Sequence, residues 1–212
     1  MTAAPGLLWV AVLPVKALAT AKSRLATGSD ERRRALARAF AIDTLSALRG
    51  SEQMAAIAVV CDDDRLAVTL AAAKVALLAE PGPGGLNGAA KAGITWAAAH
   101  HRDAGVIVVP ADLPALRTSD VSEVLRRATA HPRTVLGDCE GLGTTMLTGL
   151  PGSLPRPRFG PGSLAAHLAD GAVALDATGL DRAARDVDTE QHLNEVRRLG
   201  VGSATGRVLA GA

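Results

Sequence analysis

A chain of 212 residues with 48% hydrophobic side chains can bury a substantial core, so we expect one domain over residues 1–212. The net charge is only +2, from 23 Lys and Arg against 21 Asp and Glu, and aromatic residues make up 2% of the chain. Nucleic-acid-binding proteins cluster basic charge and often stack bases on aromatic rings, so this composition argues against a nucleic-acid partner.

The cysteines and the apolar runs predict a cytoplasmic protein. Cys61 and Cys139 lie far apart and form neither a disulfide framework nor a metal-type pair, which favours a reducing compartment. The first apolar run, residues 7–15, is too short to cross a bilayer and has no basic leader or cleavage site. We therefore expect no signal peptide and no membrane partner.

Apolar runs alternate with amphipathic stretches, which is typical of βαβ units around a mostly parallel central sheet flanked by helices. Run 7–15 has the continuous hydrophobicity of a strand buried on both faces. Ala37, Ala41, Leu45 and Leu48 then fall on one face of a helix over residues 30–48. Further strands are predicted at 55–60, 75–79, 106–109, 145–150 and 172–175, and further helices at 65–73, 86–102, 118–130, 163–170 and 189–199. The Gly- and Pro-rich segment 137–163 is otherwise predicted to be loop.

Three cations follow the first strand. In open α/β sheets, ligands bind beyond the carboxyl ends of the strands, and Lys16, Lys22 and Arg24 lie in a loop at such a position. They could offset the charge of a triphosphate, although a solvated basic loop is an equally good interpretation. The loop matches neither the P-loop nor the dinucleotide-binding pattern, which disfavours both of those protein classes.

Two other segments carry carboxylates that could bind a metal ion. Asp112 comes after the strand at 106–109, between Pro110 and Pro114, and Asp186 and Asp188 would share one face of an extended segment. Three such carboxylates are typical of a Mg²⁺ site for phosphoryl transfer. More ordinary roles are also open, because Asp112 could shape a turn and either Asp188 or Thr189 could cap the following helix.

A Gly-rich turn at residues 158–163 opens a predicted helix. Such a turn presents main-chain N–H groups to an anion, and Ser163 could either bind or cap. Thr144 offers another hydroxyl, and His167 lies one helical turn after Ser163, where it could border the anion or be structural. Asp62 and Glu80 each follow a strand and could contact a ribose or a base.

Together these segments resemble one family. The motifs PVK (14–16), AKSRL (21–25), LN (86–87), DLP (112–114), RFGPGS (158–163) and DVDT (186–189) occur in that order. They resemble the guanylyltransferases of deazaflavin coenzyme F-420 biosynthesis, a family that includes phosphoenolpyruvate and 2-phospho-L-lactate guanylyltransferases. The resemblance implies a GT-A-like nucleotidyltransferase fold in which Asp112, Asp186 and Asp188 hold Mg²⁺.

The resemblance also assigns roles to the remaining candidates. It places Lys16, Lys22 and Arg24 at the phosphates of GTP, Asn87 at the nucleoside, and Thr144, Gly160 and Ser163 at the acceptor. Lys16 and Lys22 would join Asp112 as catalytic residues.

The expected reaction transfers GMP from GTP to phosphoenolpyruvate. It releases pyrophosphate and forms enolpyruvoyl-2-diphospho-5'-guanosine, which a downstream transferase would consume. The acceptor could instead be 2-phospho-L-lactate or 3-phosphoglycerate; an Ala-, Gly- and Arg-rich composition suggests actinobacterial relatives and so favours phosphoenolpyruvate. Molybdopterin and sugar nucleotidyltransferases are alternatives, but they usually carry a Gly-rich first loop. An inactive nucleotide-binding regulatory module is the alternative outside enzymes, and the three carboxylates argue against it.

Overall fold

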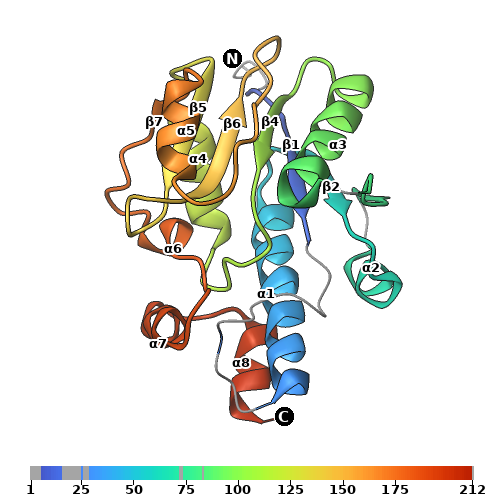
Figure 1. The fold of residues 1–212 in the computed structure, drawn as a ribbon. Coiled ribbons are helices and arrows are strands. Elements are labelled where there is room, and N and C mark those ends of the chain that lie inside the picture. Colours follow the sequence, from blue (N-terminus) through green and yellow to red (C-terminus); the bar gives the residue numbers. More distant parts are fainter. Residues whose placement is uncertain (1–5, 16–24, 26–28, 72–73, 83, 212) are drawn as a thin grey trace, which may run out of the picture.

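The computed structural model describes residues 6–15, 25, 29–71, 74–82 and 84–211. Within these residues, seven strands form one sheet in the order β3-β2-β1-β4-β6-β5-β7 (Figure 1). The strands are β1 (Trp9–Pro14), β2 (Met54–Val60), β3 (Val75–Leu78), β4 (Gly105–Val108), β5 (Arg133–Gly137), β6 (Thr144–Gly149) and β7 (Val173–Ala174). Strand β6 runs antiparallel to β4 and β5, and all other neighbouring pairs are parallel. The predicted mostly parallel α/β fold is confirmed.

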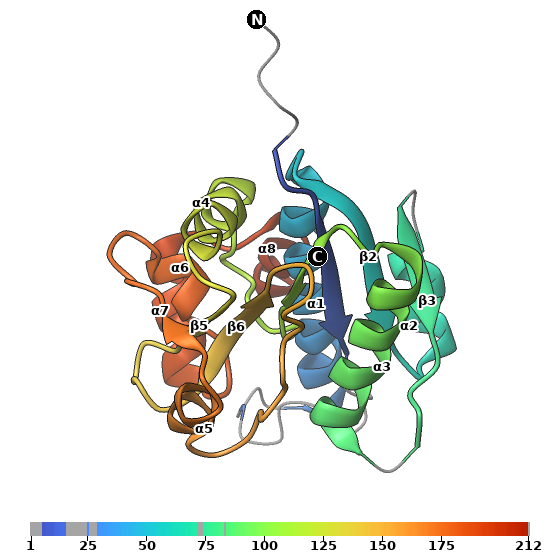
Figure 2. The ribbon, with the colours of Figure 1, turned by 90° about the horizontal axis from the view of Figure 1, so that it is seen from above.

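Helices cover both faces of the sheet (Figure 2). The described helices are α1 (Asp30–Gly50), α2 (Asp64–Leu70), α3 (Gly85–His100), α4 (Thr118–Ala128), α5 (Ser163–Ala169), α6 (Asp181–Ala184), α7 (Glu190–Leu199) and α8 (Ser203–Ala210). Helices α3 and α5 lie on one face, and α1 and α4 lie on the other. None of the helices in the described ranges combines the length and apolarity that a bilayer span requires.

Strand β1 is the centre of the core, as its continuous apolar run predicts. Trp9, Ala11 and Leu13 belong to the cluster beneath α1 and α4, whereas Val10 and Val12 belong to the cluster beneath α3. Alternate residues of a strand point to opposite faces, so a strand covered on both faces needs apolar side chains throughout.

Helix α3 approaches β1 closely because residue 93 is glycine. A Cβ at Gly93 would lie 2.2 Å from Cγ1 of Val12, too close for any real contact. The bare backbone therefore sets the spacing between this helix and the central strand.

The C-terminal segment packs at one end of α1. Leu36 and Phe40 of α1 contact a buried cluster that includes Val187 and the α7 residues Leu193 and Val196. Helix α8 is held by the buried Asp43, whose carboxylate accepts hydrogen bonds from the main-chain N–H groups of Ala204 (3.0 Å) and Thr205 (2.8 Å). This carboxylate supplies the N-terminal cap of a helix 160 residues further along the chain.

Three elements were not predicted from the sequence. Strand β5 is a five-residue run that directly follows Pro132, and α6 is a single turn, so neither carries a periodic pattern long enough to recognise. Helix α8 contains Gly206 and a β-branched Thr205, both weak helix formers, and depends on its packing against α1 and its cap from Asp43. The predicted loop from 137 to 163 is correct apart from β6, which was predicted within one residue.

Candidate active site

The three carboxylates predicted to hold metal converge. Asp112, Asp186 and Asp188 each place one carboxylate oxygen within 4.8 Å of the other two. The main chain joins their segments directly, because the N–H of Val187 donates to the carbonyl of Asp112 (3.2 Å). Carboxylate oxygens are hard ligands, so the donor set fits a hard divalent cation. Oδ1 of Asp112 is shielded from solvent, which strengthens its electrostatic interaction with any bound charge.

The loop that carries Asp112 is fixed from two sides. The buried hydroxyl of Thr44, on α1, accepts a hydrogen bond from the N–H of Leu113 (3.2 Å). The N–H of Gly202, just before α8, donates to the carbonyl of Pro114 (2.8 Å). The two residues after Asp112 are therefore held by distant parts of the chain, which preorganises its carboxylate.

Helix α4 anchors the chain that leads to Asp186. Arg182 of α6 forms a two-pronged ion pair with Asp120 of α4, with both N–O distances 2.9 Å. Asp120 is buried, and its carboxylate also accepts a hydrogen bond from the N–H of Arg117 at the start of α4 (3.0 Å). Bidentate geometry holds a guanidinium in a fixed orientation, so α6 and the residues after it are docked firmly.

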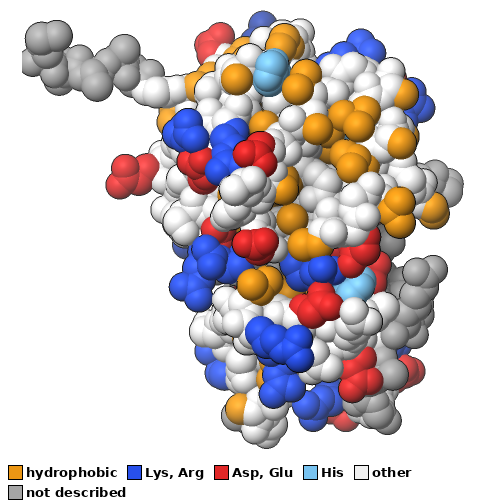
Figure 3. Space-filling model, turned by 90° about the vertical axis from the view of Figure 1, so that its left-hand side faces the viewer, with side chains coloured by type: hydrophobic (Ala, Val, Ile, Leu, Met, Phe, Trp, Pro, Cys, Tyr) orange, Lys and Arg blue, Asp and Glu red, His pale blue; other side chains and the backbone are white. Residues whose placement is uncertain are grey.

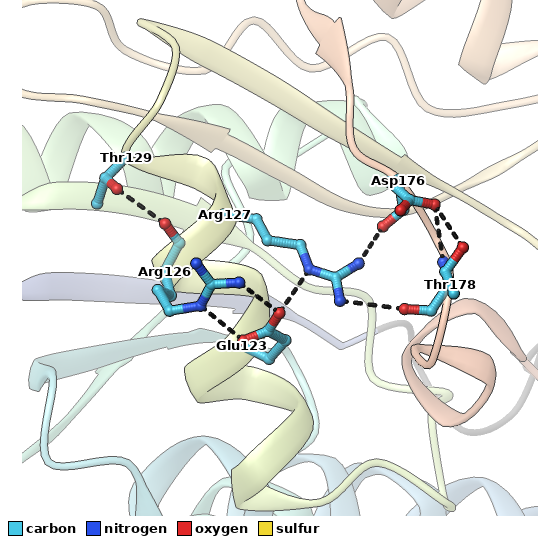
Figure 4. Close-up of polar contacts among 6 residues, drawn as sticks. All are labelled: Glu123, Arg126, Arg127, Thr129, Asp176 and Thr178. Carbon is cyan, nitrogen blue, oxygen red and sulfur yellow. Dashed lines mark hydrogen bonds and ion pairs between the residues drawn. The ribbon is translucent and has the colours of Figure 1, made fainter.

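A second contact from α4 holds the connection between β7 and α6 (Figure 4). Arg127 donates to the carbonyls of Asp176 and Thr178, and its Nε contacts Glu123 at 2.7 Å. Hydrogen bonds from Arg126 and Arg127 lower the pKa of Glu123 to about 2. The carboxylate therefore stays ionised and keeps Arg127 aimed at this connection.

Asp186 is shared with a second acidic group. Asp138, Glu140 and Asp186 also have carboxylate oxygens within 4.8 Å of one another. The Asp138 carboxylate accepts hydrogen bonds from the N–H groups of Leu142 (2.9 Å) and Gly143 (2.7 Å), so it shapes the turn before β6. Asp138 and Glu140 follow β5, and recognising that strand would have marked them as strand-end carboxylates.

The face that carries α6 and α7 shows acidic and basic side chains intermixed across its middle and lower parts, with hydrophobic side chains gathered above (Figure 3). Among the described residues, Arg185 pairs with Glu140 and with Glu195, the latter at 3.1 Å. The sequence did not single out Arg185 or Glu140.

The residues predicted to bind the acceptor also come together. Thr144 is the first residue of β6 and Ser163, which is buried, is the first residue of α5. His167 joins the two segments, with Nδ1 2.9 Å from the Thr144 hydroxyl and Nε2 2.8 Å from the main-chain nitrogen of Arg158. Gly160 has a φ of +139°, which a side chain would strain, so the turn into α5 depends on glycine here.

His167 is buried beside Phe159, whose ring meets it edge-on with 5.2 Å between centroids. Burial lowers the pKa of the His167 imidazole below its ordinary value. The Asp170 carboxylate and a hydrogen bond with the main chain of Ser163 act in the opposite direction, and Arg158 reinforces the lowering. The ring is therefore neutral near pH 7.

Asn87 has a visible structural role. Its amide nitrogen donates to the carbonyl of Phe159, and its amide oxygen accepts from the N–H of the same residue, both at 2.8 Å. These paired hydrogen bonds tie the turn at 158–163 to α3. Contact with the nucleoside stays a prediction for this residue.

The basic loop lies outside the described residues. Lys16, Lys22 and Arg24 therefore have no structural description, although their flanking residues Val15 and Leu25 are buried. Leu25 belongs to the same buried cluster as Val187, the residue between Asp186 and Asp188 in the sequence. Leu25 therefore shares a core cluster with the carboxylate segment.

Asp62 and Glu80 are joined at the ends of β2 and β3. The main-chain N–H of Glu80 donates to the carboxylate of Asp62 (2.7 Å), so Asp62 links two strand ends. A role for either side chain toward ribose or base stays untested.

An α/β sheet with carboxylates gathered beyond the end of β4 defines the class of nucleotidyltransferases with a GT-A-like fold. A crystal structure from Desulfovibrio desulfuricans G20, described as a nucleotide-diphospho-sugar transferase, has this fold, with a TM-score of 0.75 at 18% identity over 96% of this chain and 94% of that one. The chain belongs to the family described as guanylyl transferase CofC like, whose model matches residues 9–209.

Named relatives agree with this family. The phosphoenolpyruvate guanylyltransferase of Streptomyces coelicolor is 44% identical over 203 residues, covering 95% of this chain and 96% of that protein. The protein of the same name from Streptomyces scabiei is 42% identical over 207 residues, covering 95% and 96%. The family predicted from the motifs is confirmed.

Proposed function

We propose that this chain transfers GMP from GTP to phosphoenolpyruvate, which releases pyrophosphate and forms enolpyruvoyl-2-diphospho-5'-guanosine. The observation that carries the proposal is the convergence of Asp112, Asp186 and Asp188 in a chain that belongs to a guanylyltransferase family. The choice of acceptor follows the names of its relatives.

The three carboxylates would hold Mg²⁺, because their oxygens are close enough to share one ion. When bound, Mg²⁺ neutralises charge on phosphate oxygens. Lys16, Lys22 and Arg24 would steady the triphosphate of GTP.

Thr144, Gly160 and Ser163 would hold the acceptor. A phosphate oxygen of phosphoenolpyruvate attacks the α-phosphorus of GTP, a phosphoanhydride bond forms, and the bond from the α-phosphorus to the bridging oxygen of pyrophosphate breaks. No covalent intermediate with the protein is required. The product would pass to a transferase that consumes it in coenzyme F-420 biosynthesis.

The three acids share a phosphate and a carboxylate and differ in the carbons between these groups. Phosphoenolpyruvate is flat there, 2-phospho-L-lactate is tetrahedral, and 3-phosphoglycerate is longer. A difference of one methylene is worth roughly 1–3 kcal/mol to a binding pocket, so relative rates must be compared directly.

A competition experiment tests the proposal. The full chain is supplied with GTP, Mg²⁺ and equal concentrations of the three acids, and the products are identified by mass spectrometry. The enolpyruvoyl product should dominate, and ATP in place of GTP should give little product. A dominant lactyl or glyceryl product would overturn the choice of acceptor, and the absence of any guanylylated product would overturn the whole proposal.

A further inference from the structure

His167 is a buried imidazole to which the proposed reaction gives no role. Its side chain sits on α5, only 1% exposed, with the edge of the Phe159 ring against it. Both ring nitrogens lie within hydrogen-bond distance of another group, Nδ1 of the Thr144 hydroxyl and Nε2 of the Arg158 main chain. A ring whose two nitrogens both have hydrogen-bond partners has a defined orientation, and the nature of the partners decides which nitrogen carries the hydrogen.

The tautomer follows from the chemistry of the two partners. A main-chain N–H can only donate, so Nε2 must accept the hydrogen bond from Arg158 and cannot carry a hydrogen. A neutral imidazole has one N–H, which must then be at Nδ1, 2.9 Å from Thr144 Oγ1. The main chain of Ser163, one helical turn earlier, also forms a hydrogen bond with the ring and can share this hydrogen. In either case Nδ1 cannot accept from the Thr144 hydroxyl. Burial, which favours the uncharged ring, supports this assignment.

The same hydrogen bond sets the orientation of the Thr144 hydroxyl. Because Nδ1 carries a hydrogen, the hydroxyl cannot donate to the ring, and its own hydrogen is available to donate elsewhere. Within the described ranges, this hydroxyl makes no second hydrogen bond. The hydroxyl hydrogen is therefore available to a ligand that brings an acceptor oxygen.

The geometry points to His167 as a positioning residue that fixes the Thr144 hydroxyl as a donor to an anionic oxygen of the phosphorylated acid, an inference that rests on the proposed function. One side chain thereby controls both sides of the acceptor site. Its Nδ1 orients Thr144, and its Nε2 fixes Arg158, where the turn to Ser163 begins. Asn87 fixes Phe159, the next residue, so the entry to this turn is held by side chains from α3 and α5.

The competing explanation is that His167 only packs the core and supports the turn. Two amide substitutions separate these roles. In His167→Gln, the side-chain oxygen can reach the position of Nε2 and still accept from Arg158, but no donor faces Thr144. In His167→Asn, the shorter amide can replace Nδ1 as the donor to Thr144, while the contact with Arg158 is lost.

Steady-state kinetics on the full chain give the first test. We expect His167→Gln to raise the KM for phosphoenolpyruvate about tenfold and to leave the KM for GTP unchanged, because one hydrogen bond to a charged group is lost. His167→Asn should stay within about threefold of the wild type in the KM for phosphoenolpyruvate. In a Thr144→Val background, which has no hydroxyl to orient, His167→Gln should have little further effect.

NMR gives a second test that needs no turnover. Long-range ¹H–¹⁵N spectra of the ligand-free chain distinguish a protonated ring nitrogen from an unprotonated one, and the signal lost in His167→Gln identifies His167 among the five histidines. A hydrogen on Nδ1 is expected.

A hydrogen on Nε2 would overturn the inference even if the enzyme makes the expected product. Fully multiplicative effects of His167→Gln and Thr144→Val, or equal rises in the KM values of both substrates, would also overturn it. If the wild type forms no guanylylated product while Nδ1 carries the hydrogen, the proposed function fails and the ring assignment stands.

Discussion

Replacing Asp112 by Asn should make the metal-free protein more stable while it removes most of the activity. The site gathers three carboxylates whose oxygens lie within 4.8 Å of one another, and like charges at that separation repel. Asn has nearly the same shape as Asp but no charge, so the substitution removes two of the three repulsions and leaves the packing intact.

The magnitude follows from Coulomb's law. At 4.8 Å each repulsion is worth ~0.9 kcal/mol with the screening of bulk water and ~3.5 kcal/mol with the effective dielectric constant near a protein surface. Asp112, Asp186 and Asp188 each make a further interaction and lie partly in solvent, so we expect a net gain nearer the water-screened value, about 1–3 kcal/mol. For a chain of this size, each kcal/mol raises the Tm by about 2–4 °C.

Scanning calorimetry with EDTA and with saturating Mg²⁺ measures the effect. The wild type should be stabilised by Mg²⁺ and Asp112→Asn much less so, because ligands that bind the folded state raise its stability. Turnover of the variant should fall by orders of magnitude. Asp103→Asn is the matched control, because Asp103 is exposed and belongs to neither described carboxylate group.

A Tm in EDTA that is unchanged or lower in Asp112→Asn would show that the carboxylates are not held in mutual repulsion. An undiminished response to Mg²⁺ would remove Asp112 from the metal site.

Other contacts lead to further predictions. Asp43→Ala removes both hydrogen bonds to α8 and should lower the free energy of unfolding in urea by about 2–4 kcal/mol; a loss no larger than that of Asp103→Ala would contradict the capping role. Lys22→Ala should weaken GTP binding by about 1–3 kcal/mol in calorimetry, and an unchanged affinity would make the basic loop a merely solvated one. Because burial lowers the pKa of His167, the unfolded chain binds the proton first, so stability should fall as pH drops below about 6.5. Between pH 7.5 and 5, the free energy of unfolding should therefore change less with pH in His167→Gln than in the wild type. An equal change in the two proteins would contradict this role of His167.

The central part of the fold could be predicted because its elements carry their own patterns. Strand β1 is apolar throughout because helices cover both of its faces, and α1 shows one apolar stripe. Helix α8 could not be predicted, because its cap is Asp43 in a distant helix. A side chain that caps from so far away leaves no local signal at the helix start.

The candidate site divides in the same way. Asp112, Asp186 and Asp188 were identified because strand ends and i, i+2 spacing are visible in a sequence. The contacts that support them, such as Thr44 with Leu113, join residues that the sequence gives no reason to pair. For His167 the sequence allows either an anion contact or a structural role, and it gives no sign of the two partners, Thr144 and Arg158, that hold the ring.

The antiparallel direction of β6 explains how one edge of the sheet carries both halves of the proposed site. Strand β4 ends toward Asp112, and its Val108 lies opposite Leu147 of β6. Because β6 runs the other way, its first residue, Thr144, lies at the edge where β4 ends. A parallel strand at this position would carry Thr144 to the opposite edge, far from the carboxylates. Transfer of a nucleotidyl group requires the acceptor oxygen and the α-phosphorus to be held in line. A reversed strand next to β4 would meet this requirement, because it puts Thr144, proposed to bind the acceptor, at the same edge as the carboxylates proposed to hold Mg²⁺.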